Sequence, residues 1–256
     1  MADGVAAPLS ATALVMIGQP NLFMNLRRTR ITRAMIHDQA ILFTIADRKD
    51  RIQACHSRGR FYEPDELKLI AQHFPQGGVF CDAGANVGNH SLYALKFLGA
   101  TQVIPFEPNP TAYELFLSNM ILNGVLDKVD TATLGYGLTD TRDAPNMSLA
   151  ARAKNLGATQ LVLGDDGTIP VLPGDDLLGG RKVDFLKVDV EGMELEVLRG
   201  LEKTIAATRP PIFMEVDHIN NDRLLAWAAS MGYELAVEGR SFKKNRNILL
   251  TAQAKP

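Results

Sequence analysis

The sequence predicts an α/β protein with a doubly wound, mostly parallel sheet, and three observations lead to this prediction. From residue 78 onward, short apolar runs typical of strands alternate with longer runs typical of helices. A turn with two glycines, GANVG at 84–88, joins the first of these strands to the next helix. Carboxylates stand where several predicted strands end, and the strand ends of such a sheet form one ligand-binding edge.

An N-terminal extension is predicted for residues 1–62. Residues 1–18 are apolar but lack the basic start of a secretory signal, so a flexible start is expected. The next segment is basic and is predicted to be either a solvated turn or a weak contact for an anionic partner such as a lipid headgroup. Its charges are Arg27, Arg28, Arg30 and Arg33. A β-favouring run lies within 34–46, and 51–56 is its predicted partner in a β-hairpin.

The main domain is predicted to cover residues 63–256. Pro64 at the first helical turn favours a helix over 61–74. The elements that follow are, in order, strand 79–83, helix 89–98, strand 101–107, helix 110–123, strand 128–138, an irregular segment over 139–182, strand 183–190, helix 193–207, strand 211–216, helix 221–231, and strands 233–237 and 247–252. The irregular segment contains two β-like pieces, at 159–163 and 168–172.

Composition excludes several classes of protein. The 256 residues are 46% hydrophobic and 22% charged, with a net charge of −2, which argues against broad nucleic-acid binding through phosphate neutralisation. No run of about 18 apolar residues predicts a transmembrane helix. The two cysteines, Cys55 and Cys81, support neither a disulfide framework nor a zinc motif, so a reducing cytoplasm is the expected location.

The glycine turn narrows the choice of cofactor. Gly84 and Gly88 allow close backbone approach to a ligand, and the following helix offers its N–H groups. A dinucleotide site needs the pattern G-x-G-x-x-G, but Asn86 and Asn89 occupy the second and third glycine positions. Asp82, at the end of the strand, would also repel a pyrophosphate. A cationic ligand without phosphates suits this turn better.

Glu107 supplies the second part of the cofactor argument. It ends the strand 101–107 and lies 107 − 84 = 23 residues after Gly84, where a carboxylate can accept hydrogen bonds from both hydroxyls of a ribose. S-adenosylmethionine meets both requirements, with its ribose at Glu107 and its ammonium and sulfonium groups near Asp82. It is therefore the predicted cofactor.

The sequence resembles the FkbM-type S-adenosylmethionine-dependent methyltransferases of class I fold. The resemblance covers about residues 60–237. The motifs that carry it are FYE at 61–63, DAGANVGNHSL at 82–92, FEPNP at 106–110, NMILNG at 119–124, DFLKVDVEGMELEVLRG at 184–200 and RPPIFMEV at 209–216.

The family resemblance implies a seven-stranded sheet whose last strand is antiparallel. It also implies that Asp82, Gly84, Asn86 and Gly88 hold the methionine end of the donor, with Glu107 at the ribose. Asp140, in GLTD, corresponds to an acidic position on the adenine side. The candidate donor-binding set is completed by Asn89, Pro108 and Asp189.

Candidate catalytic residues follow the strand 183–190. Strand alternation puts Lys187 and Asp189 on one side, Glu191 follows just beyond, and Glu215 ends the adjacent strand. Two readings remain open. Lys187 pairs with Glu215 as a structural ion pair, or Asp189 or Glu191 binds the acceptor or takes its proton.

Two histidines are further candidate bases. His90 lies in the first turn of the helix after the glycine turn, where the helix dipole disfavours the imidazolium, or it only hydrogen-bonds to the loop. His218 follows the strand 211–216. Although His218 and the nearby carboxylates are metal-ligand types, no tight ligand spacing supports a site, so no metal is expected. Phe61 and Tyr62 are expected either to close over the cofactor or to pack the extension on the sheet.

The predicted function is S-adenosylmethionine-dependent O-methylation of a sugar, glycan or other small hydroxylated acceptor. The alternatives are a nicotinamide-dependent (NAD(P)) oxidoreductase, which uses a similar strand, turn and helix, and a non-catalytic nucleoside-binding module on the same scaffold. The acceptor pocket is expected to involve 141–180 and the extension. The sequence does not identify the acceptor or its methylated atom.

Overall fold

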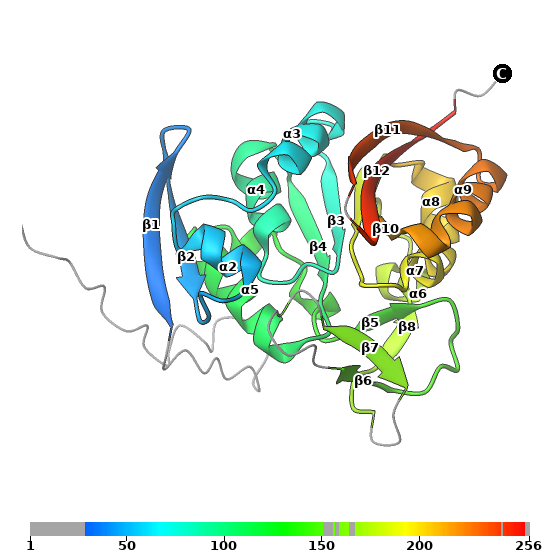
Figure 1. Cartoon of the computed structure of the whole chain (residues 1–256), viewed down its shortest axis with the longest axis horizontal. Coiled ribbons are helices and arrows are strands. Elements are labelled where there is room, and N and C mark those ends of the chain that lie inside the picture. The colour runs from blue at the N-terminus through cyan, green and yellow to red at the C-terminus, as the bar shows by residue number, and fades with distance from the viewer. Residues whose placement is uncertain (1–28, 151–155, 157–158, 164–166, 242, 254–256) are drawn as a thin grey trace, which may run out of the picture.

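The computed structural model describes residues 29–150, 156, 159–163, 167–241 and 243–253. Its central sheet has the order β11-β12-β10-β9-β3-β4 (Figure 1). The neighbours β10, β9, β3 and β4 run parallel, and β12 is antiparallel to both β10 and β11. The strands are β3 (Val79–Ala83), β4 (Gln102–Phe106), β9 (Phe185–Val188), β10 (Ile212–Asp217), β11 (Tyr233–Ser241) and β12 (Asn245–Ala252).

Helices cover both faces of this sheet, which confirms the doubly wound prediction. Side chains that alternate along β3 enter different cores: Cys81 and Ala83 join one, and Phe80 joins the other. The first core contains residues of α6 (Gly174–Leu178), α7 (Glu194–Gly200), α8 (Glu202–Thr208) and α9 (Asn221–Ser230). The second contains residues of α3 (Pro64–His73), α4 (Asn89–Phe97) and α5 (Pro110–Leu122).

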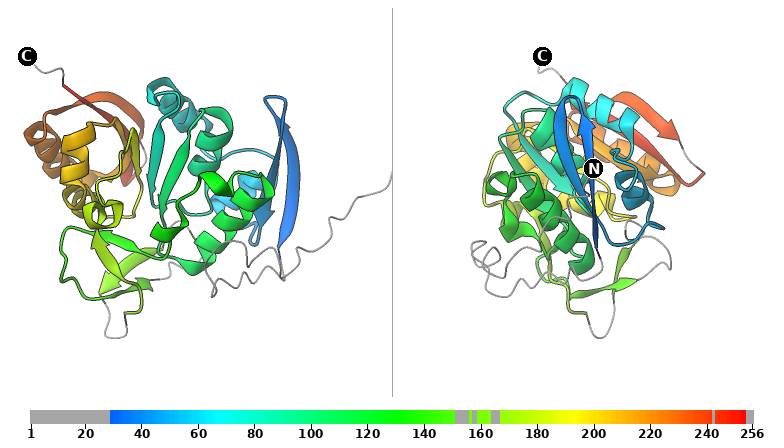
Figure 2. Two further views of the ribbon diagram at one scale, coloured as in Figure 1. Left: turned by 180° about the vertical axis from the view of Figure 1, so that it is seen from behind. Right: turned by 90° about the vertical axis from the view of Figure 1, so that its left-hand side faces the viewer.

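The N-terminal segment forms a hairpin, but the β-favouring run within 34–46 does not pair with 51–56 as predicted. β1 (Arg30–Ile36) pairs with β2 (Gln39–Ile45) through a two-residue turn, at one end of the molecule (Figure 2). His37 and Asp38 both have positive φ, the conformation whose twist suits a two-residue hairpin turn. The expected partner 51–56 is instead helix α2 (Arg51–His56), because Asp50 caps it by accepting from the Gln53 amide at 2.9 Å.

Of the basic stretch, only its last part lies among the described residues. Arg27 and Arg28 lie outside them, whereas Arg30 and Arg33 are both exposed on β1. A strand, rather than a turn, therefore carries these two charges.

The predicted strand 128–138 is mostly irregular. It comprises the 3₁₀ turns η1 (Leu126–Lys128) and η2 (Thr131–Thr133) and the short β5 (Gly137–Thr139), which pairs with β8 (Val171–Pro173) outside the main sheet. In place of a seventh strand, Val129 makes one isolated parallel bridge to Val103. The Val103 carbonyl accepts from Asp130 at this outer edge, and Pro105, two residues on, has no N–H to continue the ladder. The described part of the sheet thus has six strands.

The irregular segment contains the β-like pieces that the sequence predicts. β6 (Met147–Ala150) and β7 (Gln160–Leu163) form a small antiparallel hairpin, and β8 follows before α6. In Figure 1 this hairpin lies below the carboxyl ends of the central strands. No helix among the described residues has both the length and the apolar character needed to cross a membrane.

Candidate active site

A cavity of about 840 Å³ opens at the carboxyl edge of the parallel strands. Its walls come from the loops after β3, β4 and β9, from the last part of β10, from the turn between β11 and β12, from the segment before α3, and from the β6–β7 hairpin. The volume lies in the upper part of the range of about 300–1,000 Å³ that is usual for small-molecule sites. The predicted ligand-binding edge therefore carries a cavity large enough for a nucleoside and part of a second molecule.

The glycine turn forms one wall of the cavity. Gly84 has φ +79°, and a side chain there would overlap the carbonyl oxygen of Asp189 on the neighbouring strand end. Gly88 has φ +83°, and a side chain there would meet Met120 and Phe116 of α5. Only glycine fits both positions without strain. Gly84 and Asn86 line the cavity, whereas Gly88 holds the turn against α5.

Glu107 and Pro108 also line the cavity, on the loop after β4. The Glu107 side chain is buried and accepts from the Asn86 amide and the Asn109 amide, each at 2.8 Å. Burial raises the pKa of Glu107 to about 7, although both amide bonds favour the ionised form. A carboxylate has about four lone-pair positions, so Glu107 retains acceptor capacity for ligand hydroxyls.

Asp82 and Lys187 form a buried ion pair beneath the cavity. The Lys187 ammonium lies 3.1 Å from Asp82 Oδ1 and 3.7 Å from Asp189 Oδ2, and it donates to the Gly84 carbonyl at 2.7 Å. Ser91 donates to the other Asp82 oxygen at 2.6 Å. Burial lowers the pKa of Lys187, but the two aspartates raise it by more, so the lysine stays charged.

This arrangement differs from two sequence-based expectations. Lys187 pairs with Asp82 and Asp189, and the ion pairs of the described residues include none between Lys187 and Glu215. Asp82 is fully buried and does not line the cavity, so its charge acts on the glycine turn through Lys187. The physical reason is register: Asp82 and Lys187 are direct partners on the parallel pair β3–β9.

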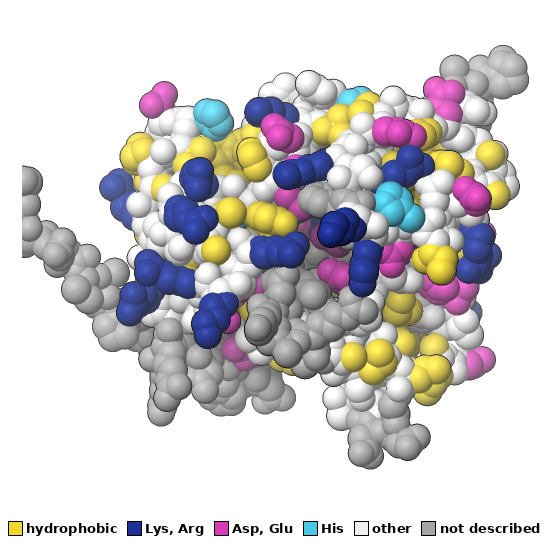
Figure 3. All heavy atoms as spheres, in the orientation of Figure 1, with side chains coloured by type: hydrophobic (Ala, Val, Ile, Leu, Met, Phe, Trp, Pro, Cys, Tyr) yellow, Lys and Arg dark blue, Asp and Glu magenta, His cyan; other side chains and the backbone are white. Residues whose placement is uncertain are grey.

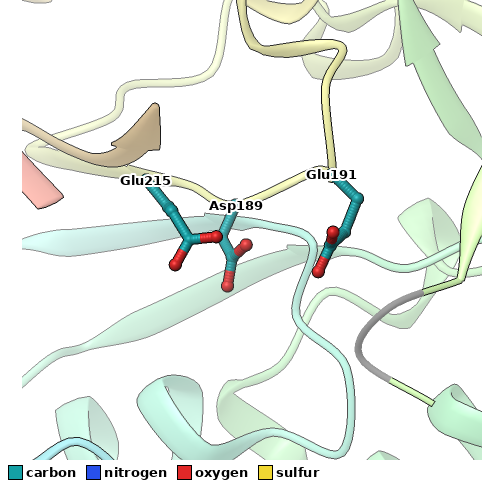
Figure 4. Close-up of side chains that lie close together, drawn as sticks. All are labelled: Asp189, Glu191 and Glu215. Carbon is teal, nitrogen blue, oxygen red and sulfur yellow. The ribbon is translucent and has the colours of Figure 1, made fainter. Parts of the chain in front are cut away.

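Three carboxylates meet at the ends of β9 and β10. Asp189, Glu191 and Glu215 each place an oxygen within 4.8 Å of the others, and Figure 4 shows the three groups side by side. Burial, followed by the charges of Asp189 and Glu191, raises the pKa of Glu215 to about 8. Asn245 of β12 donates to Glu215. We call these three residues the acidic cluster; all of them line the cavity.

Glu63 also lines the cavity, although the sequence predicts no role for it. Burial and then the charge of Asp189 raise the pKa of Glu63 to about 7. Its backbone is left-handed, with φ +55°, as are those of Asn86 and Glu191, at +49° and +56°. Left-handed residues other than glycine cost about 1–2 kcal/mol each and concentrate at functional sites. The FYE motif with the following Pro64 was the available signal, since proline keeps the preceding residue out of the right-handed helical region.

Phe61 and Tyr62, the two residues before Glu63, were expected either to close over the cofactor or to pack the extension on the sheet, and they differ in where they lie. Tyr62 lines the cavity, whereas Phe61 is buried against Phe43, Tyr93 and Phe97. Tyr62 therefore faces the ligand site, and Phe61 fastens the extension to the core.

The two candidate histidines do not line the cavity. His90 is buried, with Nε2 3.8 Å from Glu63 Oε2. Burial, with a further effect of Lys187, lowers its pKa to about 3, so its ring stays neutral and is a poor proton acceptor at neutral pH. His218 lies on η4 (His218–Asn220) beside a smaller neighbouring pocket.

Two candidate donor-binding residues also point elsewhere. Asn89 is buried and bonds to the backbone of Tyr62 at 2.9 Å and 3.1 Å, and to the ring of His56. Its side chain therefore joins the segment before α3 to the glycine turn. Asp140 is exposed, and its carboxylate lies 3.9 Å from Arg199. The cavity wall near it consists of Tyr136, Gly137 and Leu138.

Comparison with known proteins adds independent information. A family model described as the methyltransferase FkbM domain matches residues 82–235. Hexuronic acid methyltransferase AglP of Haloferax volcanii is 28% identical over an alignment of 148 positions that covers 56% of this chain and 58% of AglP. Methyltransferase sdnD of Sordaria araneosa is 29% identical over an alignment of 163 positions that covers 51% of this chain and 63% of sdnD. The chain spans about three fifths of the length of these relatives.

A solved structure supports the fold. The crystal structure of methyltransferase FkbM from Methylobacillus flagellatus KT matches with a TM-score of 0.50 and 16% identity. The match covers 80% of this chain and 56% of that chain. At this identity the likeness shows a shared Rossmann-like fold and nothing about the acceptor.

Proposed function

Because the chain belongs to the FkbM methyltransferase family, we propose that it transfers the methyl group of S-adenosylmethionine to a hydroxyl of a sugar, glycan or other small hydroxylated molecule. The observation that carries the proposal is Glu107, a buried carboxylate with free acceptor capacity beside a glycine turn that does not follow the dinucleotide pattern. The relative AglP, by its name, acts on a hexuronic acid, which supports a sugar as the acceptor.

The donor would lie along the strand ends, from the Tyr136–Leu138 wall to the acidic cluster. Glu107 accepts from the two ribose hydroxyls, and the backbone of Gly84 and Asn86 lies close to the methionine part. When bound, S-adenosylmethionine supplies an electrophilic methyl group on a sulfonium. The protein's main contribution is to hold donor and acceptor in line, which can be worth about 7–11 kcal/mol.

The acidic cluster would bind the acceptor hydroxyl and take its proton. As the new carbon–oxygen bond forms, the carbon–sulfur bond breaks, its electron pair stays on sulfur, and the hydroxyl proton passes to a carboxylate. Glu215, with a pKa near 8, is a suitable group because a base works best when its pKa is close to the working pH, and Asp189 lies beside it in the acidic cluster. A positioned base contributes about 10²–10⁴-fold to the rate.

Thermal shift of the full chain tests the cofactor assignment. S-adenosylhomocysteine and S-adenosylmethionine should raise the melting temperature, and NAD should not. Glu107→Ala should abolish most of this shift and leave the ligand-free melt largely unchanged, whereas the matched control Glu234→Ala, an exposed position on β11, should keep the shift. Stabilisation by NAD in place of the sulfur nucleosides would support the oxidoreductase alternative, and an unchanged shift in Glu107→Ala would contradict the ribose role.

A product assay tests the reaction itself. Donor binding without turnover on any hydroxylated acceptor would support the binding-module alternative. Mass spectrometry of the product would tell an oxygen-linked methyl group from a nitrogen-linked one.

A further inference from the structure

Four basic side chains line the same cavity as the acidic cluster. Lys49 and Arg51 lie at the start of α2, and Lys243 and Lys244 lie in the turn between β11 and β12. All four are exposed. The two pairs are about 190 residues apart in the chain, so the fold brings them to one opening. Figure 3 shows Lys and Arg side chains beside Asp and Glu side chains in the middle of this face.

These four charges have no carboxylate partner within the ion pairs of the described residues. The acids of the cavity have other partners. Glu107 accepts two backbone amides, Asp189 lies beside Lys187, and Glu215 accepts from Asn245. The cavity therefore keeps acidic groups along the sheet edge and basic groups around its exposed opening.

The four positive charges at the opening are more than S-adenosylmethionine needs for its own binding. S-adenosylmethionine has a single carboxylate, which one cation can hold. Three or more exposed cations at the opening then remain for the second molecule. A cationic acceptor would be repelled by them, and a neutral sugar would gain nothing from their charge.

We propose that the methyl acceptor carries an anionic group, a carboxylate or a phosphate, that is bound by Lys243 and Lys244 with Lys49 and Arg51 facing them. The next residue, Asn245, donates to Glu215 of the acidic cluster, so the basic turn adjoins the position where the hydroxyl reacts. An acceptor held by its anionic group at the opening presents a hydroxyl to the acidic cluster. This inference rests on the proposed methyltransferase function.

Calorimetric titration of the full chain, saturated with S-adenosylhomocysteine, tests the inference. The titrants are glucose, glucosamine, glucuronate and glucose 6-phosphate, which share one ring and differ in charge. Glucuronate or glucose 6-phosphate should bind about tenfold more tightly than glucose, since each exposed charge pair contributes up to about fivefold to the affinity and two or more would form. Glucosamine should bind no better than glucose. The tighter of the two anions identifies carboxylate or phosphate as the recognised group.

The variant Lys243→Gln/Lys244→Gln should reduce the preference for the anionic sugars to about twofold or less, while its affinity for S-adenosylhomocysteine stays within about twofold of the parent. The control Lys128→Gln/Lys203→Gln removes two exposed charges outside the cavity and should keep the preference. Equal binding of glucose and the anions would overturn the inference. So would a variant that loses S-adenosylhomocysteine affinity but keeps the sugar preference, because the lysines would then hold the donor's carboxylate. Failure of S-adenosylhomocysteine to bind the parent protein would refute the proposed function instead.

Discussion

Replacing Lys187 with methionine tests the role assigned to the buried ion pair. Lys187 is 2% exposed, and its ammonium is the cation next to Asp82, which is fully buried. Methionine fills similar space but leaves the Asp82 carboxylate without a counter-charge and the Gly84 carbonyl without its donor. Breaking a buried pair from one side costs about 3–5 kcal/mol, so Lys187→Met should lower the free energy of unfolding by that amount.

The double variant Lys187→Met/Asp82→Asn isolates the charge effect. Asparagine keeps an oxygen for the Ser91 hydroxyl but removes the buried charge. The double variant should therefore be more stable than Lys187→Met alone by at least about 1 kcal/mol, a non-additive result typical of residues in one network. Urea unfolding, followed by far-ultraviolet circular dichroism and the fluorescence of Trp227, measures each free energy.

Lys182→Met is the matched control, since its ion pair with Asp184 is formed by a lysine that is 70% exposed. Exposed pairs contribute about 0–1 kcal/mol. Two results would contradict the role assigned to the buried pair. One is that Lys187→Met lowers the free energy of unfolding as little as Lys182→Met does, and the other is that the double variant is no more stable than Lys187→Met.

Three further predictions concern pH and metal ions. Affinity for S-adenosylhomocysteine should rise between pH 6 and 8, measured by calorimetry, because the pKa of Glu107 is near 7 and only its ionised form accepts from both ribose hydroxyls; a flat profile would contradict this. The free energy of unfolding of the ligand-free protein should fall between about pH 6.5 and 8, since the folded pKa values of Glu63, Glu107 and Glu194 are raised to about 7 and their protonated forms favour the folded state, whereas below pH 6.5 the lowered pKa of the buried His90 opposes this trend. Urea midpoints that rise over this range would show the opposite sign. Methyl transfer should persist in EDTA, and loss of activity that Mg²⁺ restores would instead make the acidic cluster a metal site.

The core of the fold follows from local sequence signals. The strands 79–83, 101–107, 183–190 and 211–216 are short apolar runs with periodic helices between them, and each corresponds to a strand of the central sheet. The glycine turn and Glu107 were predictable because turn and carboxylate lie at fixed offsets from two neighbouring strands. The prediction of a strand over 128–138 was mostly wrong. Its β-favouring residues do not show that Pro105 ends the hydrogen-bond ladder at the edge of the sheet.

The rest of the site depends on contacts between distant segments. Nothing near Asp82 in the sequence indicates that Lys187 neutralises it, because the β3–β9 register decides that pairing. The basic side chains at 49, 51, 243 and 244 belong to two loops, and a single sequence does not show that they share an opening. The position of Asp140 outside the cavity likewise depends on β5 leaving the main sheet to pair with β8.

Two asparagine side chains, Asn119 on α5 and Asn123 at its C-terminal end, connect the N-terminal hairpin to the rest of the domain, and Asn119 also binds the glycine turn. Asn123 accepts from the Leu42 amide and donates to the Leu42 carbonyl, and Asn119 accepts from the Thr44 amide while it donates to the Val87 carbonyl at 2.7 Å. A chain shortened to start at residue 63 would remove Leu42 and Thr44, the hairpin partners of the two asparagines, and uncover the apolar side of α5. Deleting the hairpin would thus loosen the glycine turn from behind, so we expect residue 63 to be a poor place to divide this chain.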